Sequence, residues 1–443
     1  MSSPSGTVLK PGTRFRWHYI IPTLFVTQAV GMVDKVNVGI VMAFKPFLQD
    51  MHLVNQPALA GMLMTWFLLA YGIGMPVWGA ISDRIGPRRV GMAGLLIWVL
   101  MLALGGISSN LTVLYISRIG LGFGEAFMWP VCNNLTARWF PLSERSRANS
   151  FWINGINFGV ALAGILVTGI MASLGWRPLF FILAAIAFLP LALFFAFTRD
   201  DPRQVNQVDA AELQLIEAGS LVNGIGDDTP ESTKTLFSNY RFWLLALADI
   251  ATVTGVFGIN TWIPSYLTQT RHISMASLGL FISLTWLLCI GVLYLFGKWS
   301  DKLMRKAPFA AVSFVVAGVT IWGAAFVSTP LEAMILVGLS IWAVQTALHA
   351  CHSLLHSLVK TSQMGLANGV MTGVANIIGA FAPVIMGVLI GQSHNYLTSF
   401  IFLGIISLAA AVLVGILIPQ ESAFAKSYKG RTSRNRVDEL PAR

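Results

Sequence analysis

The chain has 443 residues, of which 55% are hydrophobic and only 11% are charged, and its mean hydropathy is +0.70. Soluble proteins carry roughly 25% charged residues, because their surface must face water. The composition therefore excludes a soluble protein and predicts one that lipid surrounds. The net charge of +10 does not indicate nucleic acid as a partner, because in a membrane protein basic residues report which loops face the cytoplasm.

Apolar runs long enough to cross a bilayer follow one another along the chain. A helix needs about 20 mostly apolar residues for this. Twelve such runs are predicted, and they centre on Thr27, Leu69, Trp98, Leu121, Val160, Ala187, Thr254, Leu287, Val316, Val344, Val374 and Ser407. The first run carries Asp34 and Lys35 and has no small-residue cleavage site, so it is predicted to be a retained span and not a signal peptide.

The predicted fold is an all-α membrane protein whose twelve transmembrane helices form two pseudo-symmetric six-helix bundles. Its parts are predicted as a tail 1–16, a bundle 17–198, a linker 199–239, a second bundle 240–419 and a basic tail 420–443. Of all the lysines and arginines, the outer loops would hold only Lys45, Arg177 and Arg271. This bias predicts that both tails lie in the cytoplasm and that the protein spans the cell membrane.

Three cysteines, Cys132, Cys289 and Cys351, lie inside apolar runs and are odd in number. We interpret them as small buried hydrophobic residues, and we expect neither a disulfide framework nor a metal site.

One short charged phrase occurs twice. "GAISDRIGPRRV" runs from Gly79 to Val90 and "GKWSDKLMRK" from Gly297 to Lys306, so both read G-x-x-S-D followed by Arg or Lys. Each phrase falls in a cytoplasmic loop after the second span of its half. The halves are therefore predicted to be copies, as in transporters that are built from parallel repeats.

Ionisable side chains inside the spans occur on every third span. They are Asp34, Lys35, Arg118, Glu125, Asp249, His349, His352 and His356. Because burying such groups in lipid is costly, they are predicted to face one another or a wet central path. Helix geometry places Asp34, Lys35 and Arg118 at a similar depth and Glu125 nearer the middle.

The phrase "GAISDRIGPRRV" resembles the loop signature of the major facilitator superfamily, with Pro87 in place of a basic residue. Four further phrases resemble the anion:cation symporter family within it: "RFRWHYI…MVDKVNVGIVMA", "RIGLGFGEAFMWPVCNNLTARWFPLSERSRA", "DDPRQVNQVDAAELQLI" and "INTWIPSYLTQ". The resemblance covers nearly the whole chain. It implies a non-enzymatic carrier of organic anions such as sugar acids, with protons as the coupling ion and no other cofactor.

The resemblance also implies roles for particular residues. The acids Asp34 and Glu125 would exchange the proton, because the proton affinity of a buried carboxyl group depends on burial and on nearby cations. Lys35, which stands where the family usually has Arg, and Arg118 would attract the carboxylate of the substrate. Asn157 and Asn376 would line the pocket, and the position of His349 and His352 coincides with a substrate-lining part of the family's tenth span.

Structural readings of the same residues stay open. Asp34 could pair with Lys35 or Arg118 only to hold helices together, and Asp249 could be a second site or a structural polar contact. The histidine stripe could line the pocket or make helix contacts, and no acid or cysteine completes a metal site. The amides of Asn154, Asn260 and Gln345 could bind substrate or bridge helices.

The charged phrases are predicted to form a cytoplasmic gate. Its residues would be Asp83, Arg84, Arg88, Asp301 and Lys302, which would latch the two halves while the outside is open. Alternatively, their basic residues only set the topology and contact anionic lipids.

The functional prediction is a proton-driven importer of a small organic carboxylate that works by alternating access, with lipids as its surroundings and a monomer as its working form. The alternatives are a proton-coupled exchanger or exporter and, from another class, a receptor on a transporter-like body.

Overall fold

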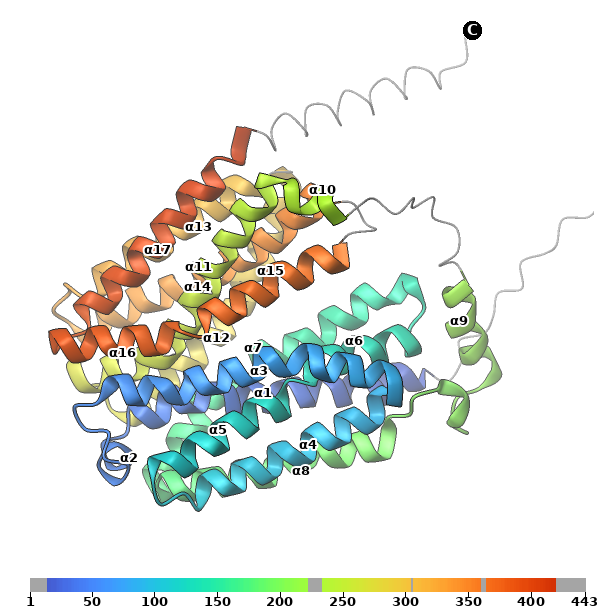
Figure 1. Cartoon of the computed structure of the whole chain (residues 1–443), viewed down its shortest axis with the longest axis horizontal. Helices are drawn as coiled ribbons and strands as arrows, with labels where there is room; N and C mark the ends of the chain where they lie inside the picture. The colour runs from blue at the N-terminus through green and yellow to red at the C-terminus, as the bar shows by residue number, and fades with distance from the viewer. Residues whose placement is uncertain (1–13, 222–232, 304–305, 360–363, 420–443) are drawn as a thin grey trace, which may run out of the picture.

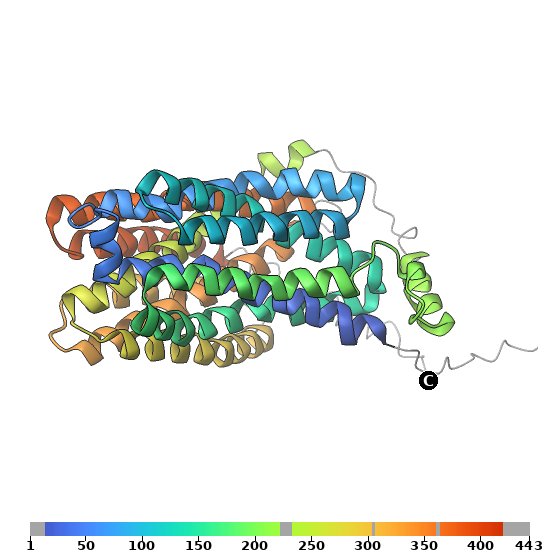
Figure 2. The ribbon, with the colours of Figure 1, turned by 90° about the horizontal axis from the view of Figure 1, so that it is seen from below.

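The computed structural model describes residues 14–221, 233–303, 306–359 and 364–419, and within them every regular element is a helix. Twelve helical segments of this described part are long and apolar enough to cross a membrane. They coincide with the twelve predicted runs, which confirms the predicted fold class. Figure 1 shows them as two bundles, one coloured blue to green and the other yellow-green to red, and Figure 2 shows their shared long axis.

The first bundle contains six spans, two of which are made of two successive helices. Its helices are η1 (Arg16–Ile20), α1 (Ile21–Met42), α2 (Lys45–Asp50), α3 (Pro57–Ile85), α4 (Pro87–Gly106), α5 (Leu111–Glu125), α6 (Met128–Trp139), α7 (Leu142–Leu174) and α8 (Trp176–Phe197). Proline at the first helical position starts α3 and α4, where its fixed φ suits the helix and its missing N–H is not needed. The side chain of Asn110 caps α5 by accepting a hydrogen bond from the amide of Val113.

After the first bundle come a connecting segment and then the second bundle. The connecting elements are η2 (Pro202–Gln204), α9 (Ala210–Leu221) and α10 (Thr233–Ser238). The second bundle contains α11 (Tyr240–Ser265), η4 (Tyr266–Thr270), α12 (Met275–Leu303), α13 (Ala307–Ala324), α14 (Pro330–Leu358), α15 (Met364–Gly379), α16 (Ala382–Ser393) and α17 (Leu397–Gly415). Thr329 and Glu332 form a reciprocal capping box at the start of α14.

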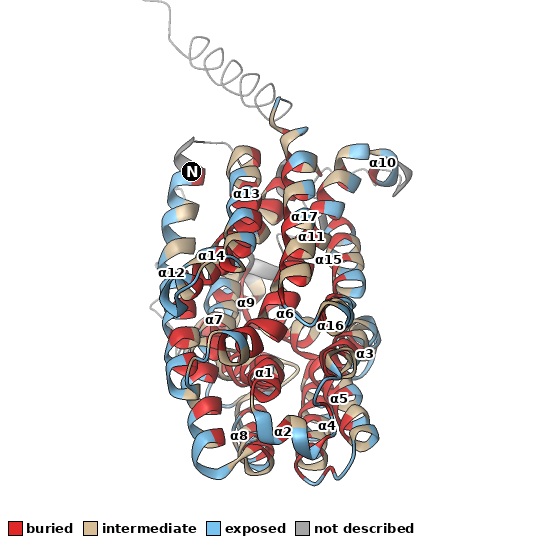
Figure 3. Ribbon diagram, turned by 90° about the vertical axis from the view of Figure 1, so that its left-hand side faces the viewer, coloured by how far each residue is buried: buried red, intermediate tan, exposed pale blue. Residues whose placement is uncertain are grey.

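Burial separates central spans from peripheral ones. In the most apolar stretch of the first span 78% of the residues are buried, and in that of the seventh span 67%, against 33% in the eighth. Figure 3 shows the buried residues on the faces that the helices turn toward one another. Large apolar side chains such as Ile73, Phe195 and Val412 are exposed on the outside, as expected for surfaces that contact lipid tails.

The two bundles touch at one end of the molecule, opposite the end where residue 14 and α9 lie. Glycines at this end let the backbones of the two bundles come close together. Gly39 near the end of α1 packs on the backbone of Asn260, and Gly61 of α3 packs on the backbone of Pro383. Between α7 and α12, Gly164 lies against Gly279, and the Ser283 hydroxyl donates to a carbonyl of α7 and accepts from the amide of Ile165. Small residues allow backbones to approach this closely, so this end of the molecule is closed.

Toward the other end the bundles diverge, as Figure 1 shows for α3 and α15. The Ile377 side chain still reaches Gly72 of α3, 3.8 Å from where a Cβ would stand. One and two turns further along the same face of α15, a Cβ atom on Gly373 or Gly369 would meet no neighbour within 4 Å. The structure is therefore closed at the end opposite α9 and separated at the end that carries α9.

Candidate functional site

Four charged side chains from α1 and α5 lie in the middle of the first bundle. Asp34, Arg118 and Glu125 are fully buried, and Lys35 is half-buried. Coulombic interactions link Glu125 with Lys35, Asp34 and Arg118, and Asp34 with Arg118. The structure thus brings these four predicted site residues together. Glu125 is the last residue of α5, next to the break between α5 and α6.

Aromatic side chains lie beside the two cations of this cluster. The Nζ atom of Lys35 lies 3.8 Å from the ring centre of Tyr71, and the Arg118 guanidinium carbon lies 5.0 Å from that of Phe67. Both rings belong to α3. Cations are attracted to aromatic faces by the ring quadrupole, and the ion pairs found among the described residues include none between these four charged groups.

The charged groups have few hydrogen-bond partners. The Trp98 indole of α4 donates to one carboxylate oxygen of Asp34 at 2.6 Å. The other oxygen of Asp34, both oxygens of Glu125 and all three nitrogens of the Arg118 guanidinium are buried without a protein partner in the described part of the chain. Leaving a buried charged group without a partner costs more than the few kcal/mol of an unmade neutral hydrogen bond. The described residues therefore leave this charged cluster short of hydrogen-bond partners.

Sequence reasoning missed three residues of this cluster. They are Trp98, which bonds Asp34, Tyr71, which stacks on Lys35, and Asn37, one turn along α1 from Asp34. Asn37 is fully buried, and both polar atoms of its amide have no partner among the described residues. Its spacing from Asp34 was a usable signal, because residues three apart share a helix face. An aromatic residue inside an apolar span carries no such signal.

The predicted pocket residues of the second bundle and of α7 lie on several helices. Asn157 of α7 is half-buried, and the Asn376 side-chain amide of α15 donates to the carbonyl of Thr372 at 2.8 Å. His349 is exposed, with its Nδ1 atom 2.8 Å from the carbonyl of Gln345. Asn260 and Gln345 line a small cavity of about 10 Å³ between α11, α12 and α14. The hydrogen bonds described for Asn376 and His349 go to the backbone of their own helices, and the role of these residues in a substrate pocket stays a prediction.

Two residues of the predicted gate, Asp83 and Arg88, contact their own half in this structure. Asp83 is exposed and accepts from the Asn134 side chain at 3.3 Å, and Arg84 is exposed. Arg88 donates through its side chain to Phe195 and through its backbone to Asp200. The side chains of Asp301 and Lys302 lie outside the described part.

The turn before Arg88 depends on glycine. Gly86 has a φ of +94°, a conformation that side-chain-bearing residues rarely adopt. A Cβ atom here would also collide with the Asp200 carboxylate. The glycine in the charged phrase therefore lets Asp200 approach the start of α4.

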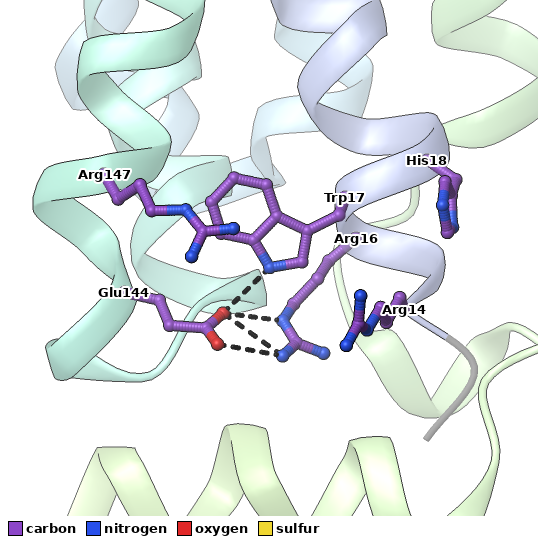
Figure 4. Close-up of a pocket in the computed structure, with 6 residues that line it drawn as sticks. All are labelled: Arg14, Arg16, Trp17, His18, Glu144 and Arg147. Carbon is purple, nitrogen blue, oxygen red and sulfur yellow. Dashed lines mark hydrogen bonds and ion pairs between the residues drawn. The ribbon is translucent and has the colours of Figure 1, made fainter. Parts of the chain in front are cut away.

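A larger hollow lies at the end of the first bundle, beside α9, and Figure 4 shows the residues around it. Its volume is about 460 Å³, and its lining residues are Arg14, Arg16, Trp17, His18, Glu144 and Arg147. Glu144 already pairs with Arg16 at 3.1 Å and accepts from the Trp17 indole. Buried Glu212 of α9 binds Arg16 at 2.7 Å. We interpret this hollow as the place where α9 is tied to the first span, separate from the central charged cluster.

No candidate metal centre emerges from the described residues, in which no three His, Cys, Asp or Glu side chains gather. The three cysteines are buried thiols.

Two bundles of six spans, a charged sequence motif that occurs once in each half and an under-partnered charged cluster inside the first bundle define a membrane carrier. The sequence model of the Major Facilitator Superfamily matches residues 24–356. The chain belongs to this superfamily, and it is a multi-pass membrane transporter and not an enzyme.

Three known proteins illustrate the similarity. The chain is 27% identical over 377 residues, covering 81% of each sequence, to a protein of Escherichia coli (strain K12) named "Probable L-galactonate transporter". It is 25% identical over 408 residues, covering 89% of this chain and 93% of the other, to the hexuronate transporter of Bacillus subtilis (strain 168). The crystal structure of a D-xylose-proton symporter shares the fold, with a TM-score of 0.73, 15% identity, and coverage of 91% of this chain and 99% of that one.

Proposed function

We propose that this protein imports a small organic carboxylate, a sugar acid or a related hydroxy acid, together with protons. The observation that carries the proposal is Arg118, whose three guanidinium nitrogens are buried without partners in the described part of the chain. A guanidinium presents a planar fork that matches a carboxylate with two parallel hydrogen bonds. L-galactonate and hexuronates, after which two relatives are named, are sugar acids with one carboxylate and several hydroxyl groups.

Lys35 and the unpartnered amide of Asn37 complete the proposed binding site. Lys35 adds a second positive charge near the same place, and Asn37 can donate to or accept from a hydroxyl group. The face of Tyr71 beside Lys35 limits the space for the substrate. A monocarboxylate with hydroxyl groups satisfies these partners better than a purely apolar acid, which would leave the Asn37 amide unpaired.

Asp34 and Glu125 are the proposed proton carriers. With both acids ionised, the four groups are neutral as a set, and adding an anionic substrate makes the set negative. A proton on Glu125 restores neutrality, and its unpartnered oxygens leave room for one. Binding of anion and proton is therefore mutually favourable, which is the energetic basis of symport.

The difference between the two ends of the structure supports alternating access as the proposed mechanism. With the tails in the cytoplasm, the closed glycine contacts lie on the outer side and the separated bundles open inward. In the other state of the proposed mechanism these contacts part and the charged loops of the two halves meet, with Asp83 and Arg84 in the inner gate.

The experiment is uptake of labelled sugar acids into proteoliposomes under an imposed inward proton gradient. Uphill uptake that collapses with a protonophore is expected for at least one of L-galactonate and glucuronate. Uptake that ignores the proton gradient would overturn the coupling, and failure of a broad panel of organic acids to bind would overturn the substrate class.

A further inference from the structure

The second bundle holds an acid–histidine pair outside the central charged cluster. Asp249 on α11 is fully buried, and its Oδ1 atom lies 3.9 Å from Nδ1 of His352 on α14. The His352 side chain is 33% exposed. Asp249 is therefore closed off from solvent, whereas His352 can exchange protons with the solvent.

Asp249 is poorly arranged to stay ionised by itself. The Thr252 hydroxyl, which belongs to the same helix, lies 3.0 Å from Oδ1 and 2.7 Å from the Asp249 carbonyl oxygen, so its single proton is shared between them. The Oδ2 atom is buried without a partner among the described residues. An isolated carboxylate in such surroundings is costly unless it gains a proton or a nearby cation.

His352, in contrast, is satisfied in both of its protonation states. Its Nδ1 atom lies 3.0 Å from the carbonyl of Leu348, which can only accept, so Nδ1 carries a hydrogen. Its Nε2 atom lies 3.4 Å from the hydroxyl of Thr372 on α15. A hydroxyl can donate or accept, so Thr372 serves neutral His352 as a donor and protonated His352 as an acceptor.

We propose that Asp249 and His352 form a second proton-binding site, separate from Asp34 and Glu125. The proton comes from water on the side that His352 faces, resides on His352 or on Asp249, and returns to that water. In either location it removes the bare buried carboxylate. The other described titratable groups that act on the pair are His349 and Cys351, both on α14. The side chain of His356 lies outside the described part.

Proton binding at this site does not depend on the proposed transport reaction, so it can be tested in purified full-length protein in lipid nanodiscs. The ring signal of His352 is recorded in histidine-labelled protein and is identified by its absence from His352→Gln. It is then followed as the pH is changed. Asp249→Asn is expected to move the midpoint of this signal at least about tenfold in proton concentration, because a charge at the distance of Asp249 contributes several kcal/mol at an effective dielectric constant of about 20. Glu125→Gln, the matched change in the other bundle, is expected to leave the midpoint of the His352 signal unaltered.

An unchanged His352 titration in Asp249→Asn would overturn the proposal. If that variant does not fold, the reciprocal measurement decides, since coupling between two sites acts equally in both directions. The infrared carboxyl band of Asp249 is followed in His352→Gln, where its midpoint is expected to move at least tenfold in proton concentration, and an unmoved band refutes the pair. Failure of the proposed symport is recognised separately, by proton-independent uptake in the wild-type protein.

Discussion

Replacing Arg118 separates a binding role from a structural one. All three guanidinium nitrogens are buried without a partner among the described residues, and the group contacts the Phe67 ring at 5.0 Å. A carboxylate held by two charged hydrogen bonds of about 1.5–3 kcal/mol each gains roughly 3–6 kcal/mol from Arg118. At about 1.4 kcal/mol per tenfold, Arg118→Met is expected to weaken binding on the order of 10²- to 10⁴-fold. Arg118→Lys, which keeps the charge and loses the fork, is expected to lose roughly one of the two bonds.

The assay is calorimetric titration of purified protein with L-galactonate and glucuronate, with melting temperature measured in parallel. Arg177→Gln serves as the control, because this exposed arginine pairs with Asp50 away from the cluster. If Arg118 were only half of a structural ion pair, Arg118→Met would cost about 3–5 kcal/mol of stability. Since the described residues form no ion pair with Arg118, we expect the ligand-free melting temperature to stay close to that of the wild type. Intact affinity in Arg118→Met would refute the reasoning.

Three further changes test other parts of the structure. Gly39→Val is expected to push the closed end apart, because a Cβ there would lie 3.2 Å from the carbonyl carbon of Asn260. Energy transfer between dyes on the two halves reports the change, and Gly373→Ala, placed in open space, should have no effect. Asp83→Asn is expected to slow uptake several-fold with unchanged affinity, because Asp83 bonds Asn134 of its own half here; altered affinity would contradict a gating role. The Trp176 indole and then the Arg177 guanidinium lower the pKa of Asp50. Their contribution to stability is therefore present at neutral pH and lost as pH falls through this lowered pKa. Asp50→Asn should lower the free energy of unfolding by less than about 1 kcal/mol at neutral pH, as the loss of an exposed pair does, and should not change it in strong acid. A loss of stability that grows as the pH falls would show that the sign is wrong.

Hydropathy was sufficient to predict the fold, because each span must satisfy its backbone internally and show lipid an apolar surface. The rarity of ionisable residues in such spans also made the cluster visible: Asp34 and Glu125 stand out in apolar runs, and they are close in space. The superfamily is confirmed by the family match, and the roles of these residues in transport remain predictions.

The partners of these residues could not be predicted in the same way. Trp98 and Tyr71 are apolar by composition, and only the register of α3 and α4 against α1 brings them to Asp34 and Lys35. The contact between Asp249 and His352 likewise depends on how α11 and α14 are rotated, which hydropathy does not specify. The closed end was not predicted either, because a carrier's sequence has to be compatible with both of its states.

Glu125→Gln in proteoliposomes tests the central claim most directly. The side chain keeps its size and loses the ability to take up a proton, so exchange of labelled sugar acid across the membrane should continue while uphill uptake driven by protons disappears. Uphill uptake at the wild-type rate in Glu125→Gln would contradict the account.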